Sequence, residues 1–251
     1  MVRNNHLKGN RGKLDELLRT DSSPDAGSLQ RVLEYARSMA DVENVLAVVS
    51  DMGADTSHIF AGGFARNLDL EDYREENSIW ENRILRLMTP EQQEEKYMAE
   101  LRFFHFLRHL PKSRRSDYYL AAKLRFRFAD GEVHDVLHRM YYVFGPDKET
   151  IRYAVCLYGP LVFDFSGKSR AVNSVSGISE ELGSDGNGAI LSPRERQILS
   201  LIDSGLKSKE IAERLCISIH TVSRHRQEII ASLQAKNTHE ACRLAKSLKI
   251  I

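Results

Sequence analysis

Hydrophobic and polar residues alternate through the middle of the chain. In residues 118–128, one face of an extended segment would carry Tyr118, Leu120, Ala122, Leu124, Phe126 and Phe128. The opposite face would carry Lys123, Arg125 and Arg127. This period of two predicts a strand with one solvated face. Turns at Asp130-Gly131 and at residues 145–148 lead into further strands at 133–144 and 151–158, which predicts a three-stranded antiparallel meander.

The residues before the meander combine two strands with several helices. Residues 45–49 are apolar and predict a buried strand, with which residues 57–61 are expected to pair. Helical spacing of apolar residues after Ser28 predicts an amphipathic helix with Ser28 as its N-cap. Short helical stretches are expected in residues 67–88. Thr89-Pro90 then predicts the start of a longer helix that ends near Pro111.

The carboxy-terminal residues predict four helices. Ser192-Pro193-Arg194-Glu195 forms a capping box that starts a helix to about Ser204, with Gly205 as its stop. Later helices are expected at 209–215, from 219 to about 233, and after residue 237. Their predicted N-caps are Ser208, Ser218 and Asn237.

The second and third of these helices are separated by about three residues, which is typical of a helix-turn-helix. At about 100° per residue, Val222, Ile229 and Leu233 share the buried face of the third helix. Ser223, Arg224 and Gln227 then point outward near its amino-terminal end. A recognition helix carries its base-reading residues at this end. Arginine can donate two hydrogen bonds to guanine, and glutamine can form hydrogen bonds with adenine.

The segment from Leu191 to Ala241 resembles the LuxR-type (GerE) DNA-binding domain along nearly its whole length. The matching features are Leu191 to Glu195, Gly205, Lys209 to Ala212, Ile217-Ser218, Thr221-Val222, His225-Arg226, Ile229, Leu233 and Glu240-Ala241. The resemblance implies an all-α four-helix domain that binds paired half-sites of double-stranded DNA as a homodimer and dimerises through its fourth helix. It also implies base contacts from Ser223, Arg224 and Gln227, and backbone contacts from Lys209, Thr221 and Arg226.

Several of these residues also allow a purely structural interpretation. Thr221 can stabilise the first turn of its helix, and His225 lies beside the buried face, where a packed histidine is expected. The stem of Arg226 can pack while its head reaches a phosphate. Cys216 stands where the family usually has the glycine of the turn, and Ile219-His220 replaces a polar pair, which raises a question about the turn geometry.

Charge supports a polyanion partner for this part of the chain. Residues 190–251 contain 11 Lys and Arg against 6 Asp and Glu, whereas residues 1–189 contain 25 against 29. A basic module on an acidic body favours a partner such as DNA. The 3 cysteines form no CxxC pair, and no apolar run approaches a membrane span. These features predict a soluble, cytoplasmic protein without a membrane partner.

Composition divides the chain into four parts. Residues 1–27 are polar and predict a mobile arm that carries one short helix. Residues 28–165 form the predicted α+β domain, an antiparallel sheet with flanking helices. Residues 166–189 are rich in Ser, Gly, Asn and Asp, which is typical of a flexible linker. Residues 190–251 form the helix-turn-helix domain.

The α+β domain resembles a PAS-like domain in its element order and in the fragment KLRFRFADGEVHDVLHRMYYVF. A phosphoacceptor receiver does not fit, because no acidic pair precedes Asp51 and the later half is an antiparallel meander. No acyl-homoserine-lactone pattern is found. PAS-like domains hold a small ligand or serve as dimerisation platforms. Candidate pocket residues, each of which can equally be core, are Trp80, Phe103, Phe104, His105, Phe106, His109, Leu137, Tyr141 and Cys156.

Together these patterns predict a dimeric, sequence-specific transcription regulator that is not an enzyme, with RNA polymerase as a further candidate partner. No cofactor is expected beyond an unknown small ligand of the PAS-like domain. His105 and His109 share a helix face, but two histidines alone are a weak metal or haem site. Two alternatives stay open: a haem- or ligand-binding, enzyme-like amino-terminal domain, and an interaction module that no longer binds DNA.

Overall fold

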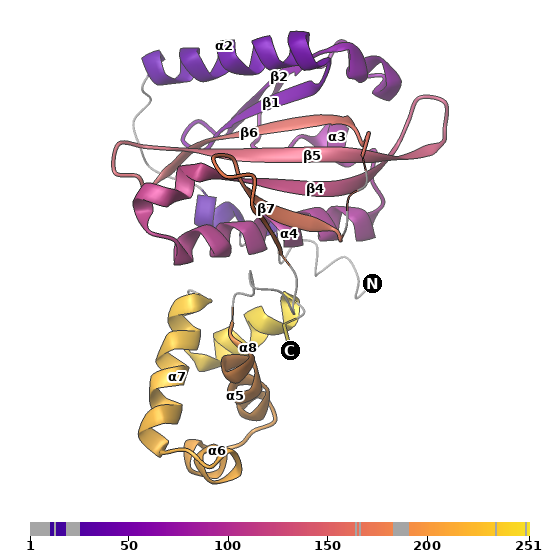
Figure 1. The fold of residues 1–251 in the computed structure, drawn as a ribbon. Helices are drawn as coiled ribbons and strands as arrows, with labels where there is room; N and C mark the ends of the chain where they lie inside the picture. Colours follow the sequence, from indigo (N-terminus) through magenta and orange to yellow (C-terminus); the bar gives the residue numbers. More distant parts are fainter. Residues whose placement is uncertain are drawn as a thin grey trace.

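The structure is a computed structural model that describes residues 11–12, 14–18, 26–163, 165, 167–182, 191–233, 235–248 and 250–251. Figure 1 shows two parts, a sheet with helices on both sides and a group of four helices. We call the described residues up to 182 the sheet domain and those from 191 the carboxy-terminal domain.

The sheet domain has an antiparallel sheet of 8 strands in the order β3-β2-β1-β6-β5-β4-β7-β8. The strands are β1 (Leu46–Asp51), β2 (Thr56–Ala61), β3 (Glu75–Glu76), β4 (Tyr118–Arg127), β5 (Val133–Phe144), β6 (Ile151–Pro160), β7 (Ser169–Asn173) and β8 (Ser179–Glu181). The predicted meander is confirmed as β4-β5-β6. The early hairpin joins it through β1 and β6, where Val48 lies opposite Cys156.

Helices cover both faces of the sheet (Figure 1). They are α2 (Ala26–Glu43), η1 (Gly63–Leu68), α3 (Asn82–Leu85), α4 (Pro90–His109) and η2 (Lys112–Asp117). The start of α4 is confirmed, because Thr89 and Gln92 form a reciprocal capping box. The predicted N-cap of α2 is wrong: the helix begins at Ala26, so Ser28 lies inside its first turn.

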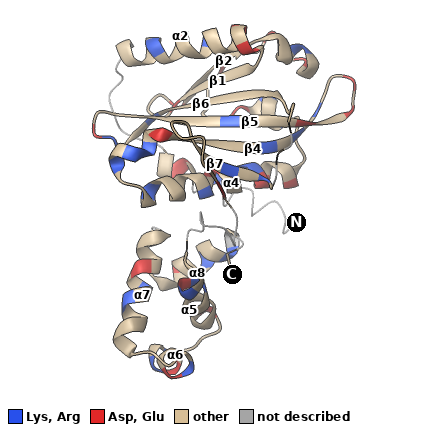
Figure 2. Cartoon of the chain, in the orientation of Figure 1, with Lys and Arg blue, Asp and Glu red and all other residues tan. Residues whose placement is uncertain are grey.

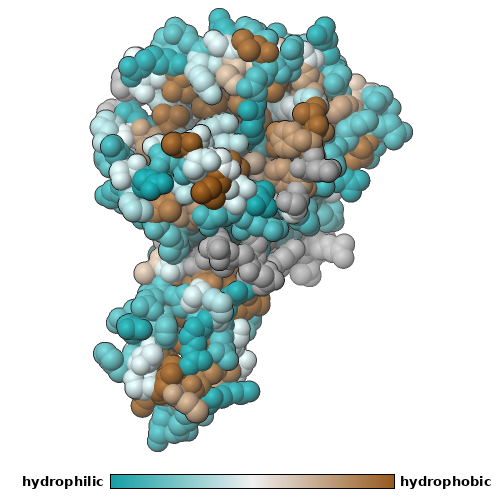
Figure 3. Space-filling model, viewed as in Figure 1, coloured by the Kyte–Doolittle hydropathy of each residue, from teal (hydrophilic) through white to brown (hydrophobic). Residues whose placement is uncertain are grey.

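The two sheet faces bury different sets of residues. On one face α2 packs Ala36 and Ala40 against a cluster that includes Val49 and Val155. On the other face α4 packs Phe103 and Leu101 into the main apolar core. The exposed large apolar residues include the neighbours Val162 and Phe163, and Figure 3 shows several distinct brown patches on a mostly hydrophilic surface.

The short helix expected in residues 1–27 is present in the described residues 11–12 and 14–18, but its packing does not fit a mobile arm. Leu14 and Leu18 are buried in the main core, at 0% and 5% exposure. Nε1 of Trp80 donates a hydrogen bond of 2.6 Å to Oδ1 of Asp15. The segment is mostly polar, but its two leucines at positions i and i+4, Leu14 and Leu18, pack it against the sheet domain.

The expectation of a flexible linker is wrong for residues 169–182. There β7 and β8 form a hairpin that extends the sheet beyond β4, with Ala171 opposite Leu120. Ser169, Ala171 and Asn173 are buried at alternate positions, so the strand has a core face although it lacks large apolar side chains. Residues 183–189 of the predicted linker lie outside the described residues.

The carboxy-terminal domain has four helices, α5 (Pro193–Asp203), α6 (Ser208–Leu215), α7 (Ile219–Ser232) and α8 (Thr238–Ser247). The predicted buried face of α7 is confirmed, because Val222, Ile229 and Leu233 are at most 2% exposed. The capping box at Ser192 and the N-caps Ser218 and Asn237 are also confirmed. The antiparallel sheet domain and the helical helix-turn-helix domain thus agree with the expected fold class at this level.

Candidate nucleic-acid interface

The turn between α6 and α7 keeps a left-handed geometry without glycine. Cys216 ends α6 with φ 52° and ψ 44°. Its N–H donates to the carbonyl of Glu213, and that of Ile217 donates to the carbonyl of Ala212 at 3.0 Å. Left-handed backbone is strained for residues other than glycine. The cysteine therefore preserves the turn that glycine usually supplies, at some cost in stability.

The start of α6 differs from the prediction by one residue. Ser208 is the first residue of the helix rather than its N-cap. The N-cap is Lys207, whose N–H donates 2.6 Å to Oε2 of Glu210. The hydroxyl of Ser208 is consequently not occupied by capping and accepts a hydrogen bond from another helix.

The outward face of α7 carries the three predicted base-reading residues. Ser223, Arg224 and Gln227 are all exposed or half-exposed, whereas Val222 beside them is fully buried. Nε of Arg224 lies 3.5 Å from Oε1 of Glu228, and the side chain of Arg224 is 64% exposed. A surface pair of this kind is weak, so the guanidinium can leave it for another acceptor. Figure 2 shows positively and negatively charged positions along α7.

Lys209 and Thr221 lie near the amino-terminal ends of α6 and α7. The side chain of Lys209 is near the surface, whereas the hydroxyl of Thr221 is engaged within its own helix. The N–H of Thr221 donates 3.0 Å to Oγ of Ser218, and the two hydroxyl groups are 2.8 Å apart. Thr221 thus helps to close the first turn of α7, and a contact with a DNA phosphate would be an additional role.

Arg226 joins three helices of the domain. Nη1 donates 2.9 Å to Oγ of Ser208, the first residue of α6. Nη2 donates 3.1 Å to Oγ1 of Thr238, the first residue of α8. The guanidinium group of Arg226 is therefore hydrogen-bonded within the domain, whereas the family resemblance implied that it contacts a phosphate. Helical phase could show that Arg226 points partly inward, but not which hydroxyl groups it meets.

The sheet domain contains a second concentration of polar groups, in its interior. Nζ of Lys96 lies 2.5 Å from Oε1 of Glu100, and both side chains are at most 6% exposed. They line a small cavity of about 20 Å³ together with Glu81, Tyr142, Trp80 and other residues. A cavity of this volume holds about one water molecule.

Burial and neighbouring charges shift the pKa values of two ionisable groups in this interior. Burial raises the pKa of Glu81, which favours its protonated form. Burial also acts to lower the pKa of Lys96, but the carboxylates of Glu100 and Glu81 outweigh it and the net shift of that pKa is upward. The ammonium group of Lys96 therefore keeps its positive charge beside its hydrogen-bond partner Glu100.

Several buried polar atoms near this cavity have no partner in the described chain. The hydroxyl group of Tyr142 and both ring nitrogens of His138 form no hydrogen bond there. His138 stacks on Tyr158 with ring centroids 4.7 Å apart, and both residues are fully buried. Burial lowers the pKa of His138 and raises the pKa of Tyr142, so both side chains stay neutral. Unpaired buried polar groups cost stability and are uncommon.

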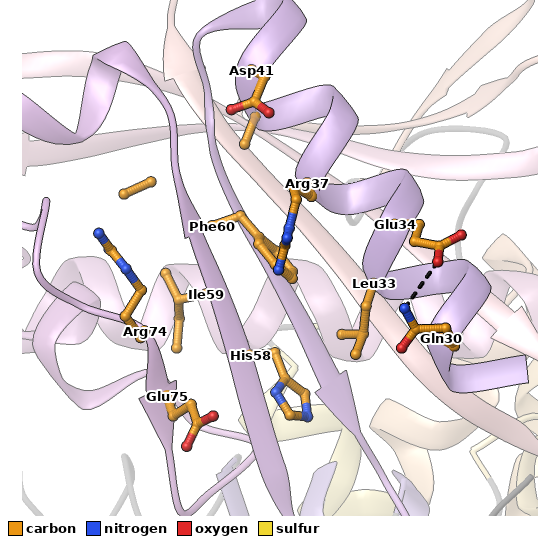
Figure 4. A pocket seen from close by; sticks show the side chains of 12 residues that line it. Gln30, Leu33, Glu34, Arg37, Asp41, His58, Ile59, Phe60, Arg74 and Glu75 are labelled. Atoms are coloured by element: carbon orange, nitrogen blue, oxygen red, sulfur yellow. Dashed lines mark hydrogen bonds between the residues drawn. The ribbon is translucent and has the colours of Figure 1, made fainter. Parts of the chain in front are cut away.

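A larger groove of about 520 Å³ lies on the outer side of the sheet domain, between α2 and β2 (Figure 4). Arg37 of α2 lies over the ring of Phe60, 5.4 Å from its centroid, and His58 is also on β2. Three carboxylates, from Glu34, Asp41 and Glu75, line the same groove. The groove is open and carries both signs of charge, so its lining does not select one class of ligand.

The predicted pocket residues are divided between different places. Trp80 and Cys156 line the interior cavity, whereas Phe103, Phe104 and Phe106 are buried core residues. Leu137 and Tyr141 do not line that cavity; Tyr141 packs against the cluster under α2 on the other side of the sheet. Nδ1 of His109 bonds to the carbonyl of His105 at 2.8 Å, so this pair does not converge on a shared ligand.

Metal-ligand clusters and membrane-spanning helices are both absent from the part of the chain that the structure describes. No three His, Cys, Asp or Glu side chains come together there as possible metal ligands. Among the same residues, no helix has the length and apolar character needed to cross a membrane.

Residues 189–245 match the family model described as bacterial regulatory proteins, luxR family. The oxygen regulatory protein NreC of Staphylococcus carnosus (strain TM300) is 42% identical over 62 residues, which are 25% of this chain and 29% of the relative. NreC of Staphylococcus aureus (strain JH9) has the same identity and coverage. The chain therefore matches less than a third of the length of these curated relatives.

Two solved structures show a distant likeness over most of the chain. The phage VqmA–DPO complex is 12% identical, with a TM-score of 0.37, and the match covers 89% of this chain and 90% of that chain. The VqmA dimer of Vibrio cholerae in the absence of target DNA is 14% identical, with a TM-score of 0.33 and coverage of 88% of each chain. Both likenesses are too weak to assign a fold to the sheet domain.

Proposed function

From the luxR-family helix-turn-helix domain at residues 189–245, we propose that this chain is a sequence-specific, DNA-binding transcription regulator. The observation that carries the proposal is the outward face of α7, where Ser223, Arg224 and Gln227 face away from the buried Val222. Side chains so placed can reach base edges when the helix lies in the major groove.

Affinity and sequence choice would come from different residues. Lys209 and Thr221, near the starts of α6 and α7, would contact the DNA backbone; the charge of Lys209 would supply salt-dependent affinity, and the hydroxyl of Thr221 would help to position the helix. Ser223, Arg224 and Gln227 would read bases, with Arg224 leaving Glu228 for a guanine. Arg226 would act mainly by holding α6, α7 and α8 together, and a phosphate contact would be secondary.

Replacing Arg224 by alanine is expected to weaken binding to the preferred operator by about 1–3 kcal/mol, because the bidentate contact to one base would be lost. Random DNA should be affected much less. Competition binding measures the affinity for operator duplexes and the affinity for random duplexes. Arg114→Ala in η2 is a matched control, since Arg114 is also exposed and also pairs with a carboxylate, that of Asp117. Equal weakening on operator and random DNA in the Arg224 variant would contradict a base-reading role.

We further propose that the regulator acts as a homodimer on paired half-sites and that RNA polymerase is a partner. The dimer would use α8, in keeping with the family resemblance, and also the sheet domain, because PAS-like domains serve as dimerisation platforms. The domain limits we propose follow the hydrogen bonding: a sheet domain that extends to Leu182, and a DNA-binding domain from about residue 190. The hairpin β7–β8 supports extending the sheet domain from residue 165, the limit expected from sequence, to Leu182.

For the sheet domain we propose a PAS-like fold with a sensory role. The element order supports it, with an early hairpin, intervening helices and a meander in one sheet. The buried polar groups around Tyr142, His138 and Lys96 support a sensory role over a purely structural one. A scaffold would not retain unpaired buried polar atoms, whereas a binding site leaves them for a ligand.

Replacing Tyr142 by phenylalanine is expected to raise the free energy of unfolding by about 1–2 kcal/mol, because it removes a buried hydroxyl that has no partner in the described chain. Tyr73→Phe is the matched control and should be destabilising, since Tyr73 donates 2.7 Å to Glu76. Urea unfolding measures both variants. A loss of stability in the Tyr142 variant would mean that the hydroxyl is satisfied by an ordered water, and the sensory argument would lose its support.

A further inference from the structure

Arg102 of α4 connects the sheet domain to the carboxy-terminal domain. Nη1 donates 3.1 Å to the carbonyl of Leu182, which follows β8. Nη2 donates 2.9 Å to the carbonyl of Leu248, the C-cap of α8. One guanidinium group therefore holds the end of the sheet domain and the end of the last DNA-binding helix at the same point. In Figure 1, α8 lies on the side of the carboxy-terminal domain that faces α4.

The surroundings of Arg102 differ from those of an ordinary surface arginine. Its side chain is partly buried, and burial lowers its pKa without an offsetting carboxylate. Both hydrogen bonds go to backbone carbonyls instead. A cation at the carboxy-terminal end of α8 also meets the negative end of the helix dipole. The contact is thus charge-assisted at both acceptors.

Apolar packing surrounds this hydrogen-bonded junction. Leu182 and Leu248 are 2% and 0% exposed, and they belong to one apolar cluster that runs from the sheet domain into the carboxy-terminal domain. Arg102 therefore lies at the polar centre of a packed junction, which favours one orientation of the two domains over a freely rotating tether.

We propose that Arg102 is a positioning residue for DNA recognition, which fixes the orientation of α7 relative to the sheet domain and so determines the half-site spacing that the dimer accepts. This inference rests on the proposed function. Two recognition helices in successive major grooves must be separated by about 34–36 Å. Flexibly tethered domains accept several separations with similar affinity, whereas domains held by a fixed junction favour one.

The test uses the full chain and duplexes with two selected half-sites separated by spacers that vary in steps of one base pair, together with a duplex that has one half-site. The wild-type chain should favour one spacing. Arg102→Ala should reduce that preference about tenfold and leave the affinity for the single half-site unchanged, since the reading face is untouched. Arg102→Lys keeps the cation but cannot span both carbonyls, and it should be intermediate.

Arg108→Ala is the control on the same helix, because Arg108 approaches Glu149 of the sheet domain at 3.9 Å. It should keep the wild-type spacing preference. If Arg102→Ala retains that preference, or binds every spacing more tightly, the inference is overturned while the proposed function stands. If the wild-type chain binds no duplex, the proposed function fails and takes this inference with it. Should Arg102→Ala lose its fold, as seen by circular dichroism, Arg102→Lys decides between these outcomes.

Discussion

Replacing Lys96 by methionine is expected to lower the free energy of unfolding of the sheet domain by about 3–5 kcal/mol. Lys96 and Glu100 form a buried ion pair at 2.5 Å, with Glu81 buried beside them. Without the ammonium group, the carboxylate of Glu100 would be left in the core with no cation. Trp80 is the only tryptophan of the chain and lines the same cavity, so its fluorescence during urea unfolding reports on this domain.

Two further variants separate the charge from the packing. Lys96→Met combined with Glu100→Leu should recover most of the lost stability, because an apolar pair of similar volume is often as stable as a buried ion pair. Lys168→Met disrupts an exposed pair with Glu95 and should change little. A Lys96→Met variant that behaved like Lys168→Met would show that the interior pair is not shielded from water.

Replacing Arg226 by alanine is expected to destabilise the carboxy-terminal domain by about 2–3 kcal/mol, because two charge-assisted hydrogen bonds would be lost. These bonds connect α7 to Ser208 and Thr238, at the starts of α6 and α8. The helical signal in circular dichroism should melt earlier, while the Trp80 transition of the sheet domain stays in place. Operator binding should also fall, since α6 and α7 would no longer be held at their present angle.

A second measurement on the same variant distinguishes the structural role from a phosphate contact. If Arg226 only contacted phosphate, alanine would leave unfolding unchanged, weaken all DNA sequences equally and reduce the salt slope by about 1. Arg214→Ala is the control, because Arg214 is exposed on α6. Identical unfolding transitions in the Arg226 and Arg214 variants would rule out the structural role of Arg226.

Local features of the carboxy-terminal domain could be predicted from sequence. Ser192, Ser218 and Asn237 cap their helices as expected, because a cap depends on residues within one turn. The buried face of α7 follows from helical period alone. The meander was predictable for the same kind of reason, since its alternation and its turns are local signals.

Features that depend on distant partners could not be predicted. Arg102 meets Leu248, 146 residues away in sequence, and neither residue has a neighbour that signals the contact. The segment 169–182 has a linker-like composition and becomes a hairpin only because β4 offers an edge for pairing. The hydroxyl groups that accept hydrogen bonds from Arg226 belong to two other helices, α6 and α8. In each case tertiary structure decides the outcome over local composition.

The DNA-binding claim is tested most directly by selection of bound fragments from a random duplex library, using the full chain and Arg224→Ala in parallel. We expect the wild-type chain to enrich a motif with two related half-sites, and we expect the variant to lose preference at one position in each half-site. Recovery of random sequences by the wild-type chain, or an identical motif from both proteins, would contradict base reading by the exposed face of α7.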